Sequence, residues 1–193
     1  MSQLTAADLY SLEQYAKIRK DFRARIIGHK RDRKVPIGPN ATLYFEDRLT
    51  MQYQIQEMLR IERIFEEEGI QDELNAYNPL IPDGRNFKAT FMVEFPDSEE
   101  RKAALARLIG IEDQVWVQVA GHEPVHAIAD EDLDRENDTK TSSVHFLRFE
   151  LSDAMAAALK GGAGLFLGIA HPNYDYRVEA LSAVRDSLAA DLA

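Results

Sequence analysis

The chain contains no cysteine among its 193 residues. This absence excludes disulfide bonds, thiolate metal sites, cysteine nucleophiles and iron–sulfur clusters ligated by the protein. Long hydrophobic runs are also missing, because none approaches the ~18–20 residues that a membrane-spanning helix needs. The N-terminus lacks the basic and then apolar pattern of a secretion signal. We therefore expect a soluble protein in the cytoplasm, with no membrane as a partner.

Several sequence motifs that are typical of particular enzyme classes are absent as well. The sequence has no glycine-rich phosphate-binding loop, no G-x-S-x-G nucleophile motif and no pair of E-x-x-H motifs of the kind found in di-iron helical bundles. Nothing in the composition identifies a cofactor. The two function classes that stay open are a binding or accessory protein and an enzyme whose motif is less conventional.

Charge is distributed unevenly along the chain. The net charge is −10, yet the segment 17–34 holds nine basic and two acidic residues, so it carries +7 and the remainder carries −17. Such a segment binds an acidic protein partner or nucleic acid, or it packs on the protein's own acidic surface. Nucleic acid is the least favoured of these, because no recognisable nucleic-acid-binding pattern accompanies the charge. A homo-oligomer is compatible with the sequence.

Hydrophobic periodicity predicts an α+β fold in a single domain, with an N-terminal helical part over 1–80 and a sheet-containing part over 81–193. Apolar residues at three- and four-residue spacing predict long helices over about 8–33 and over 46–68, the second ending at Gly69. Alternating patterns then predict a mainly antiparallel sheet of about five strands. An amphipathic pattern predicts a C-terminal helix over 174–192.

An acidic residue interrupts the apolar side of the predicted helix 46–68. Glu62 falls near the centre of an apolar arc, and a carboxylate there needs a cation, hydrogen-bond donors or a proton. The strand 143–151 offers partners, because its alternation places His145 on one face and Arg148 on the other. We hypothesise that Glu62, with Arg60, His145 or Arg148, lines a polar pocket between the helix and the sheet, where a small anion binds.

The same residues allow two other interpretations. A buried structural ion pair perturbs charges as a binding site does, so Glu62 and its partner are open to a purely structural role. Alternatively, Glu62 and His145 form the acid–base pair of an enzyme. Replacement of Glu62 by glutamine separates a structural from a functional role.

The string His122-Glu123-Pro124-Val125-His126 matches the H-E-x-x-H pattern of zinc hydrolases in form. That chemistry requires both histidines on one face of a helix. Here the string falls where the segments 115–119 and 125–129 read as paired strands, with 121–124 as their turn. A hairpin with exposed histidines is therefore expected, and a metal-dependent hydrolase through His122, Glu123 and His126 is only an alternative.

Two further segments contain candidate ligands. The acidic run 130–138 is spaced like a calcium loop, but Arg135 stands where the loop needs glycine and Thr141 where it needs glutamate, so a solvated acidic connection is predicted. His171 precedes Pro172 at the end of a predicted strand, where it serves as a turn residue or lines a site.

Four long stretches carry a resemblance to a known family. They are IGPNATLYFEDRLTMQYQIQEMLRIERIF, ELNAYNPLIPDGRNFKAT, ADEDL with TSSVHFLRFEL, and GIAHPNY. With these strings the chain resembles the bacterial family described as domain of unknown function 3501, over nearly its full length. The resemblance implies no established activity, and the H-E-x-x-H string is not among the residues that carry it. The first hypothesis is thus an uncharacterised binding or accessory protein.

Overall fold

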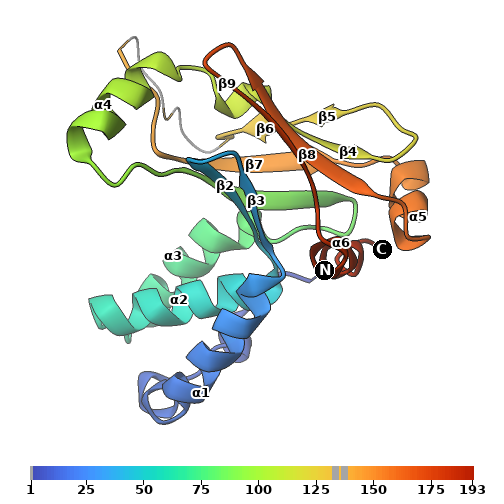
Figure 1. Cartoon of the computed structure of the whole chain (residues 1–193). Coiled ribbons are helices and arrows are strands. Elements are labelled where there is room, and N and C mark those ends of the chain that lie inside the picture. Colours follow the sequence, from blue (N-terminus) through green and yellow to red (C-terminus); the bar gives the residue numbers. More distant parts are fainter. Residues whose placement is uncertain (1, 132–134, 136–138) are drawn as a thin grey trace.

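The computed structural model of the chain describes residues 2–131, 135 and 139–193. It contains an N-terminal helical layer and two antiparallel sheets, with further helices beside the sheets (Figure 1). The predicted α+β class with antiparallel pairing is confirmed. The strands form two sheets rather than the single sheet of about five strands that the periodicity suggested. No helix in the described part of the chain is long and apolar enough to cross a membrane.

The helical layer consists of α1 (Leu12–Arg31), α2 (Arg48–Glu62) and α3 (Glu67–Tyr77), with short 3₁₀ turns η1 (Ala6–Asp8) and η2 (Asn78–Leu80) at its two ends. Side chains cap the first two helices. Ser11 accepts a hydrogen bond from the amide of Gln14 at the start of α1, and Asp47 accepts one from the amide of Thr50 at the start of α2. Each cap satisfies a backbone donor that the helix itself leaves unpaired.

The predicted helix 46–68 is in fact two helices. It ends at Glu62 because Arg63 adopts the left-handed conformation, with φ of 57°. The chain then reverses into α3, so Gly69 lies inside a helix instead of ending one. Leu74 of α3 packs against Ile55 and Leu59 of α2 in one cluster. The apolar stripe of α2 is therefore covered by α3, an arrangement that the periodicity alone does not distinguish from a longer helix.

Sheet A has the strand order β1-β2-β3-β7-β6. Its strands are β1 (Lys34–Ile37), β2 (Ala41–Phe45), β3 (Asn86–Val93), β7 (Val144–Glu150) and β6 (Ile128–Ala129). The predicted alternation is confirmed in β3, where Phe87, Ala89, Phe91 and Val93 are buried. In β7 the core-facing residues are His145, Leu147 and Phe149. The intervening residues of both strands therefore form the opposite, outer face of sheet A.

Sheet B has the order β5-β4-β8-β9. Its strands are β5 (Val125–His126), β4 (Val115–Val119), β8 (Leu165–His171) and β9 (Tyr174–Glu179). The helix predicted over 174–192 is wrong in its first half, since 174–179 pairs with β8 as a hairpin and α6 spans only Ser182–Ala189. Pro172 and Asn173 form a tight turn here. The segment after the turn is a strand because it hydrogen-bonds to β8. The remaining elements are α4 (Ser98–Arg107), η3 (Glu112–Gln114) and α5 (Asp153–Lys160).

One hydrophobic cluster joins the two sheets. It includes Phe91 and Phe149 from sheet A, Val117 and Leu167 from sheet B, and Leu188 from α6, all fully buried or nearly so. At about 25 cal/mol per Å² of apolar surface removed from water, a cluster of this kind supplies the main favourable term of folding. The helical layer packs through separate, smaller clusters, so it covers sheet A from outside the main core.

Arg33 connects these parts through charge. Its side chain is only 2% exposed. Nη1 donates to Asp191 at 3.3 Å and to the Ser187 hydroxyl at 3.2 Å, while Nε lies 3.4 Å from Asp47. Nε and Nη2 also donate to the carbonyl oxygens of Phe45 and Glu46 at 3.1 Å. This one guanidinium therefore ties the segment after α1 to the start of α2 and to α6.

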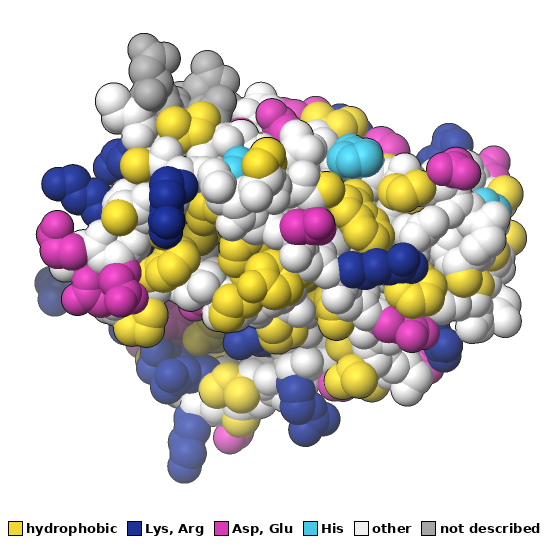
Figure 2. Space-filling view, turned by 45° about the horizontal axis from the view of Figure 1, so that its top comes forward, with side chains coloured by type: hydrophobic (Ala, Val, Ile, Leu, Met, Phe, Trp, Pro, Cys, Tyr) yellow, Lys and Arg dark blue, Asp and Glu magenta, His cyan; other side chains and the backbone are white. Residues whose placement is uncertain are grey.

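The basic segment 17–34 thus serves the fold in part. Besides Arg33, Arg19 pairs with Glu57 of α2 at 2.8 Å, which is the packing on the protein's own acids that the sequence left open. Arg23, Arg25 and Arg31 are exposed. On the face that Figure 2 shows, basic, acidic and hydrophobic side chains of the described residues are interspersed.

Replacement of Arg33 by methionine is expected to destabilise the fold by about 3–5 kcal/mol, because it leaves Asp47 and Asp191 buried without their shared cation. Urea unfolding measures the change. The matched control is Arg31→Met, an exposed arginine two residues away, which should alter the free energy of unfolding by no more than about 0.5 kcal/mol. Equal effects of the two replacements would show that the Arg33 network does not anchor the layer.

Candidate ligand-binding groove

A groove lies between the helical layer and the outer face of sheet A. Its floor is formed by residues that alternate with the core-facing ones on three neighbouring strands. Its wall is formed by α2, α3 and η2. The floor residues are Tyr44 of β2, Lys88, Thr90 and Met92 of β3, and Phe146 and Arg148 of β7.

The groove has two neighbouring parts. One cavity, of about 440 Å³, lies over Lys88 and Arg148, and the other, of about 370 Å³, lies over Tyr44 and Thr90. The two cavities are adjacent, because both are lined by Tyr77, Leu80 and Phe146. We call them together the sheet-A groove. Volumes of about 300–1,000 Å³ with mostly apolar walls are typical of small-molecule sites.

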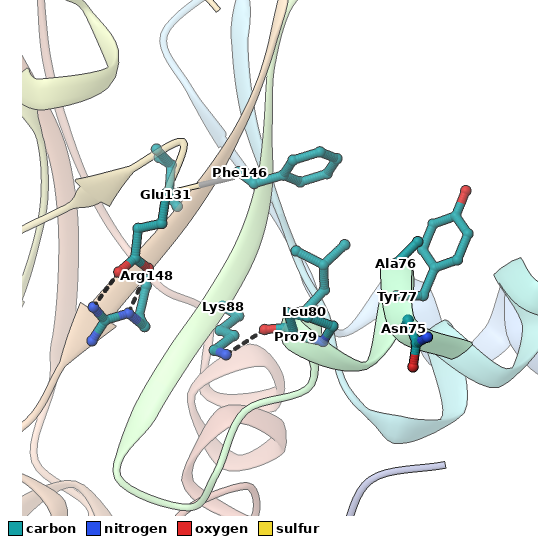
Figure 3. Close-up of a pocket in the computed structure, with 10 residues that line it drawn as sticks. Asn75, Ala76, Tyr77, Pro79, Leu80, Lys88, Glu131, Phe146 and Arg148 are labelled. Atoms are coloured by element: carbon teal, nitrogen blue, oxygen red, sulfur yellow. Dashed lines mark hydrogen bonds and ion pairs between the residues drawn. The ribbon is translucent and has the colours of Figure 1, made fainter. Parts of the chain in front are cut away.

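Two cations lie side by side on the floor of the first cavity. Lys88 and Arg148 are direct partners in the register of β3 and β7, an arrangement in which like charges repel. Arg148 is neutralised by Glu131, whose carboxylate it contacts at 2.6 and 2.8 Å, and by Glu150. Figure 3 shows the Arg148–Glu131 pair on one side of Lys88, with Pro79 and Leu80 on the other.

Lys88 is held differently from its neighbour. Its ammonium group donates to the carbonyl oxygen of Pro79 (Figure 3). Burial beneath η2 lowers the pKa of Lys88, and the adjacent Arg148 charge lowers it further against the opposing effect of the nearby acids. An ammonium has three donors, so the contact with Pro79 leaves donor capacity for a ligand. This half-buried cation is the most ligand-competent group of the groove.

The second cavity has a buried carboxylate. Glu46 is 6% exposed and accepts hydrogen bonds from the hydroxyls of Thr50, at 2.6 Å, and Thr90, at 2.8 Å. Met51 and Gln54 of α2 line the same cavity. A cavity between the predicted helix 46–68 and the sheet is thus present, but the carboxylate that faces it is Glu46. The sequence shows Glu46 only as an acid at a helix start, because its partner Thr90 is 44 residues away.

Glu62 does not occupy the place that the sequence suggested. It is exposed as the last residue of α2, so the expectation of a carboxylate trapped away from water is wrong. The reversal at Arg63 moves the end of the apolar arc to the surface, where Phe65 is 69% exposed. Arg60 contacts Glu57 at 3.1 Å on the side of α1. Neither side chain lines the sheet-A groove.

His145 and Arg148 lie on opposite faces of β7, as predicted. Arg148 faces the groove, whereas His145 is fully buried on the core side and lies 2.5 Å from Asp130 through Nδ1. The structure therefore separates the four predicted site residues, with only Arg148 in the groove. An acid–base pair of Glu62 and His145 is not supported, since one is exposed at the end of α2 and the other is enclosed between the sheets.

The H-E-x-x-H string forms the expected hairpin. β4 and β5 pair antiparallel, with Trp116 opposite His126, and His122 lies in the connecting turn. Glu123 and His126 are exposed. In the described residues, His122 and His126 belong to no group of closely spaced metal-ligand side chains. The helical geometry of a zinc hydrolase is absent from this segment.

The two other predicted segments have different outcomes. Of the acidic run 130–138, residues 132–134 and 136–138 lie outside the described part of the chain. For Asp130 the prediction of a solvated connection is wrong, because its side chain is 8% exposed and pairs with His145. His171 is 7% exposed and holds the β8–β9 turn, where Nε2 donates to the carbonyl of Ile109 and Nδ1 accepts from the amide of Asn173.

Comparisons with known proteins support the same overall structure. The sequence profile of a family described as "Protein of unknown function (DUF3501)" matches residues 3–192. The chain is similar to a crystal structure of a novel protein of unknown function from Burkholderia pseudomallei K96243, with 54% identity, complete coverage of both chains and a TM-score of 0.95. No protein with a curated description matches the chain.

A pair of substitutions on α2 tests the placement of its acids. The Arg19 guanidinium, which hydrogen-bonds Glu57, holds the pKa of that carboxyl at about 2, below its usual 4.5. The ionised group therefore stabilises the fold above about pH 4.5, and this contribution is lost as the pH falls toward 2. Glu57→Gln should cost about 1–3 kcal/mol at pH 7 and less at pH 3, as measured by urea unfolding.

The matched control is Glu62→Gln on the same helix. Because Glu62 is exposed, its replacement should change the free energy of unfolding by at most about 0.5 kcal/mol at either pH. A loss at Glu62 as large as the loss at Glu57 would restore the hypothesis of a buried Glu62.

Proposed function

Since the chain belongs to the DUF3501 family, whose description assigns no activity, we propose from the groove that the protein is a non-catalytic binding or accessory protein for a small amphipathic anion. The ligand has an apolar body and a carboxylate, sulfonate or phosphate group. The anionic group binds Lys88, and the body lies against Leu80 and Phe146 in the sheet-A groove. A cytoplasmic location is part of the proposal.

The observation that carries the proposal is the Lys88–Arg148 pair at the floor of an apolar cavity. Directly opposed like charges destabilise a sheet by a few tenths of a kcal/mol to about 1 kcal/mol, so the pair is a cost to the fold. Glu131 and Glu150 form ion pairs with Arg148. Asp83, Glu131 and Glu150 act on Lys88 by long-range attraction, while its ammonium group hydrogen-bonds the uncharged carbonyl of Pro79. An anion at Lys88 relieves this repulsion and restores a full charge partner to the half-buried ammonium.

The composition of the walls limits the ligand further. The first cavity exposes more apolar than polar surface, which comes from Ala76, Tyr77, Pro79 and Leu80 on the helical side and Phe146 on the sheet. Removal of this surface from water favours a hydrophobic body at about 25 cal/mol per Å². A purely polar ion would leave these walls uncovered, so the groove favours an amphipathic molecule over free phosphate or sulfate.

Fluorescence titration with 1-anilinonaphthalene-8-sulfonate, which combines aromatic rings with one sulfonate, tests the proposal. Lys88→Met keeps the apolar stem and removes the charge, so it should weaken binding about tenfold, the equivalent of ~1.4 kcal/mol. The matched control, Lys102→Met on α4, removes an exposed lysine outside the groove and should bind like the unaltered chain. Leu80→Trp fills the groove and should abolish binding.

The pH dependence of the same titration supplies an independent check. Burial lowers the pKa of Lys88, so the affinity of the unaltered chain should fall as the pH rises toward that pKa, and Lys88→Met should lack this dependence. Circular dichroism confirms that each variant is folded. Equal affinities of the Lys88 and Lys102 variants, or binding that survives Leu80→Trp, would refute the groove as the site.

A further inference from the structure

A second cluster of polar side chains lies on the opposite side of β7 from the groove. It contains His145, which is 0% exposed, Glu112 of η3, which is 5% exposed, and the Asp130 side chain, which is 8% exposed. Thr141, 1% exposed, completes it. One potential ligand atom from each of Glu112, Asp130 and His145 lies within 4.8 Å of the others. These groups come from three separate segments and converge at one buried point.

The hydrogen bonds of the cluster are centred on the imidazole. Nδ1 lies 2.5 Å from Oδ2 of Asp130, while Nε2 lies 3.0 Å from the Thr141 hydroxyl and 3.6 Å from Oε2 of Glu112. The carbonyl oxygen of Ser142 is also 3.0 Å from Nε2. The Thr141 hydroxyl donates to Glu112 at 3.1 Å. Two carboxylates therefore approach one histidine from its two sides in the absence of bulk water.

Asp130 is fixed in a conformation that directs one oxygen inward. It has φ of +46°, a left-handed backbone that is uncommon for residues other than glycine. Its Oδ1 accepts from the amide of Phe146 at 2.9 Å and contacts Arg135 at 3.1 Å, while its own amide donates to the Phe146 carbonyl at 2.8 Å. These outer contacts hold the carboxylate and leave Oδ2 for His145. Outer-shell bonds of this kind orient the ligands of metal sites.

We propose that Glu112, Asp130 and His145 bind a divalent transition-metal ion such as Zn²⁺ or Mn²⁺. Two carboxylates and a neutral imidazole balance the charge of a divalent ion. Ligands about 2.0–2.2 Å from one ion lie at most ~4.4 Å apart, which is close to the present spacing of within 4.8 Å. Because Asp130 lies at Nδ1 and Glu112 at Nε2, binding requires a side chain to rotate until both carboxylates and a single ring nitrogen face the ion. The nitrogen donor favours a transition metal over Mg²⁺ or Ca²⁺, which prefer oxygen alone.

Because the cluster is buried, the ion has a structural role. It joins η3 to Asp130, which follows β6, and to the start of β7. It therefore links sheet A to the segment that leads into β4 of sheet B. None of the cluster residues lines the sheet-A groove. The metal site is therefore independent of the proposed ligand, and either proposal stands if the other fails.

Isothermal titration of the EDTA-treated full chain with Zn²⁺ and with Mn²⁺ tests the proposal, together with metal content after gel filtration. We expect one equivalent of at least one of these ions. The midpoint of thermal unfolding should rise by about 5–10 °C at a free metal concentration ~100 times the dissociation constant. Failure of the unaltered chain to bind either ion with this stoichiometry would overturn the proposal, whatever the variants do.

Two isosteric variants and one control locate the ion. Glu112→Gln and Asp130→Asn should each weaken binding by at least the ~10–100-fold that loss of an outer partner costs in known sites. His126→Gln removes an exposed histidine of the H-E-x-x-H string and should bind as the unaltered chain does. Circular dichroism establishes folding of each variant. Binding that is lost in His126→Gln and kept in Glu112→Gln would place the ion at the hairpin and refute the buried site.

Discussion

The burial of Arg33 is the interaction on which the arrangement of the molecule depends. A guanidinium removed from water costs several kcal/mol unless its donors are paired. Here two carboxylates, three carbonyl oxygens and a hydroxyl accept from or pair with it. Because Asp47 caps α2 and Asp191 follows α6, the same cation fixes the start of α2 and the segment after α6. The Arg33 network therefore sets where α2 stands relative to sheet A.

The groove follows from that arrangement. The inner face of sheet A is occupied by the core shared with sheet B, so the helical layer can meet only the outer face. Its cover is incomplete over β3 and β7, where the sheet-A groove lies. The two strands place apolar residues inward and, by the alternation of a pleated strand, Lys88, Thr90, Phe146 and Arg148 outward. The strands that build the core thus also supply the polar floor of the candidate site.

The two faces of β7 illustrate how much of the structure can be predicted from the sequence. Period-two alternation correctly separates His145 from Arg148, because it is a local property of a strand. The sequence also predicts the α+β class and the hairpin at His122–His126. It does not predict the left-handed turn at Arg63, since no glycine marks it, and the error moved Glu62 from the surface to a supposed interior. The sequence predicts β8 correctly as a strand but predicts β9 as part of a helix, because the pairing of β9 with β8 is not visible in its local pattern.

The functional groups that sequence reasoning missed are those joined over long distances. Glu46 and Thr90 meet across 44 residues, and Glu112 meets Thr141 across 29. The acidic neighbours of Asp130 predict a solvated run, whereas its left-handed backbone turns it toward His145. Local composition is a poor guide to such residues, because their burial depends on which segments tertiary packing brings together.

A crystal structure of the chain soaked with 1-anilinonaphthalene-8-sulfonate tests the central claim most directly. The account predicts density for the ligand in the sheet-A groove, with the sulfonate within hydrogen-bond distance of Lys88 Nζ and the rings against Leu80 and Phe146. A saturated crystal in which the groove holds only solvent, or in which the ligand lies elsewhere with Lys88 still bonded to Pro79 alone, would contradict it.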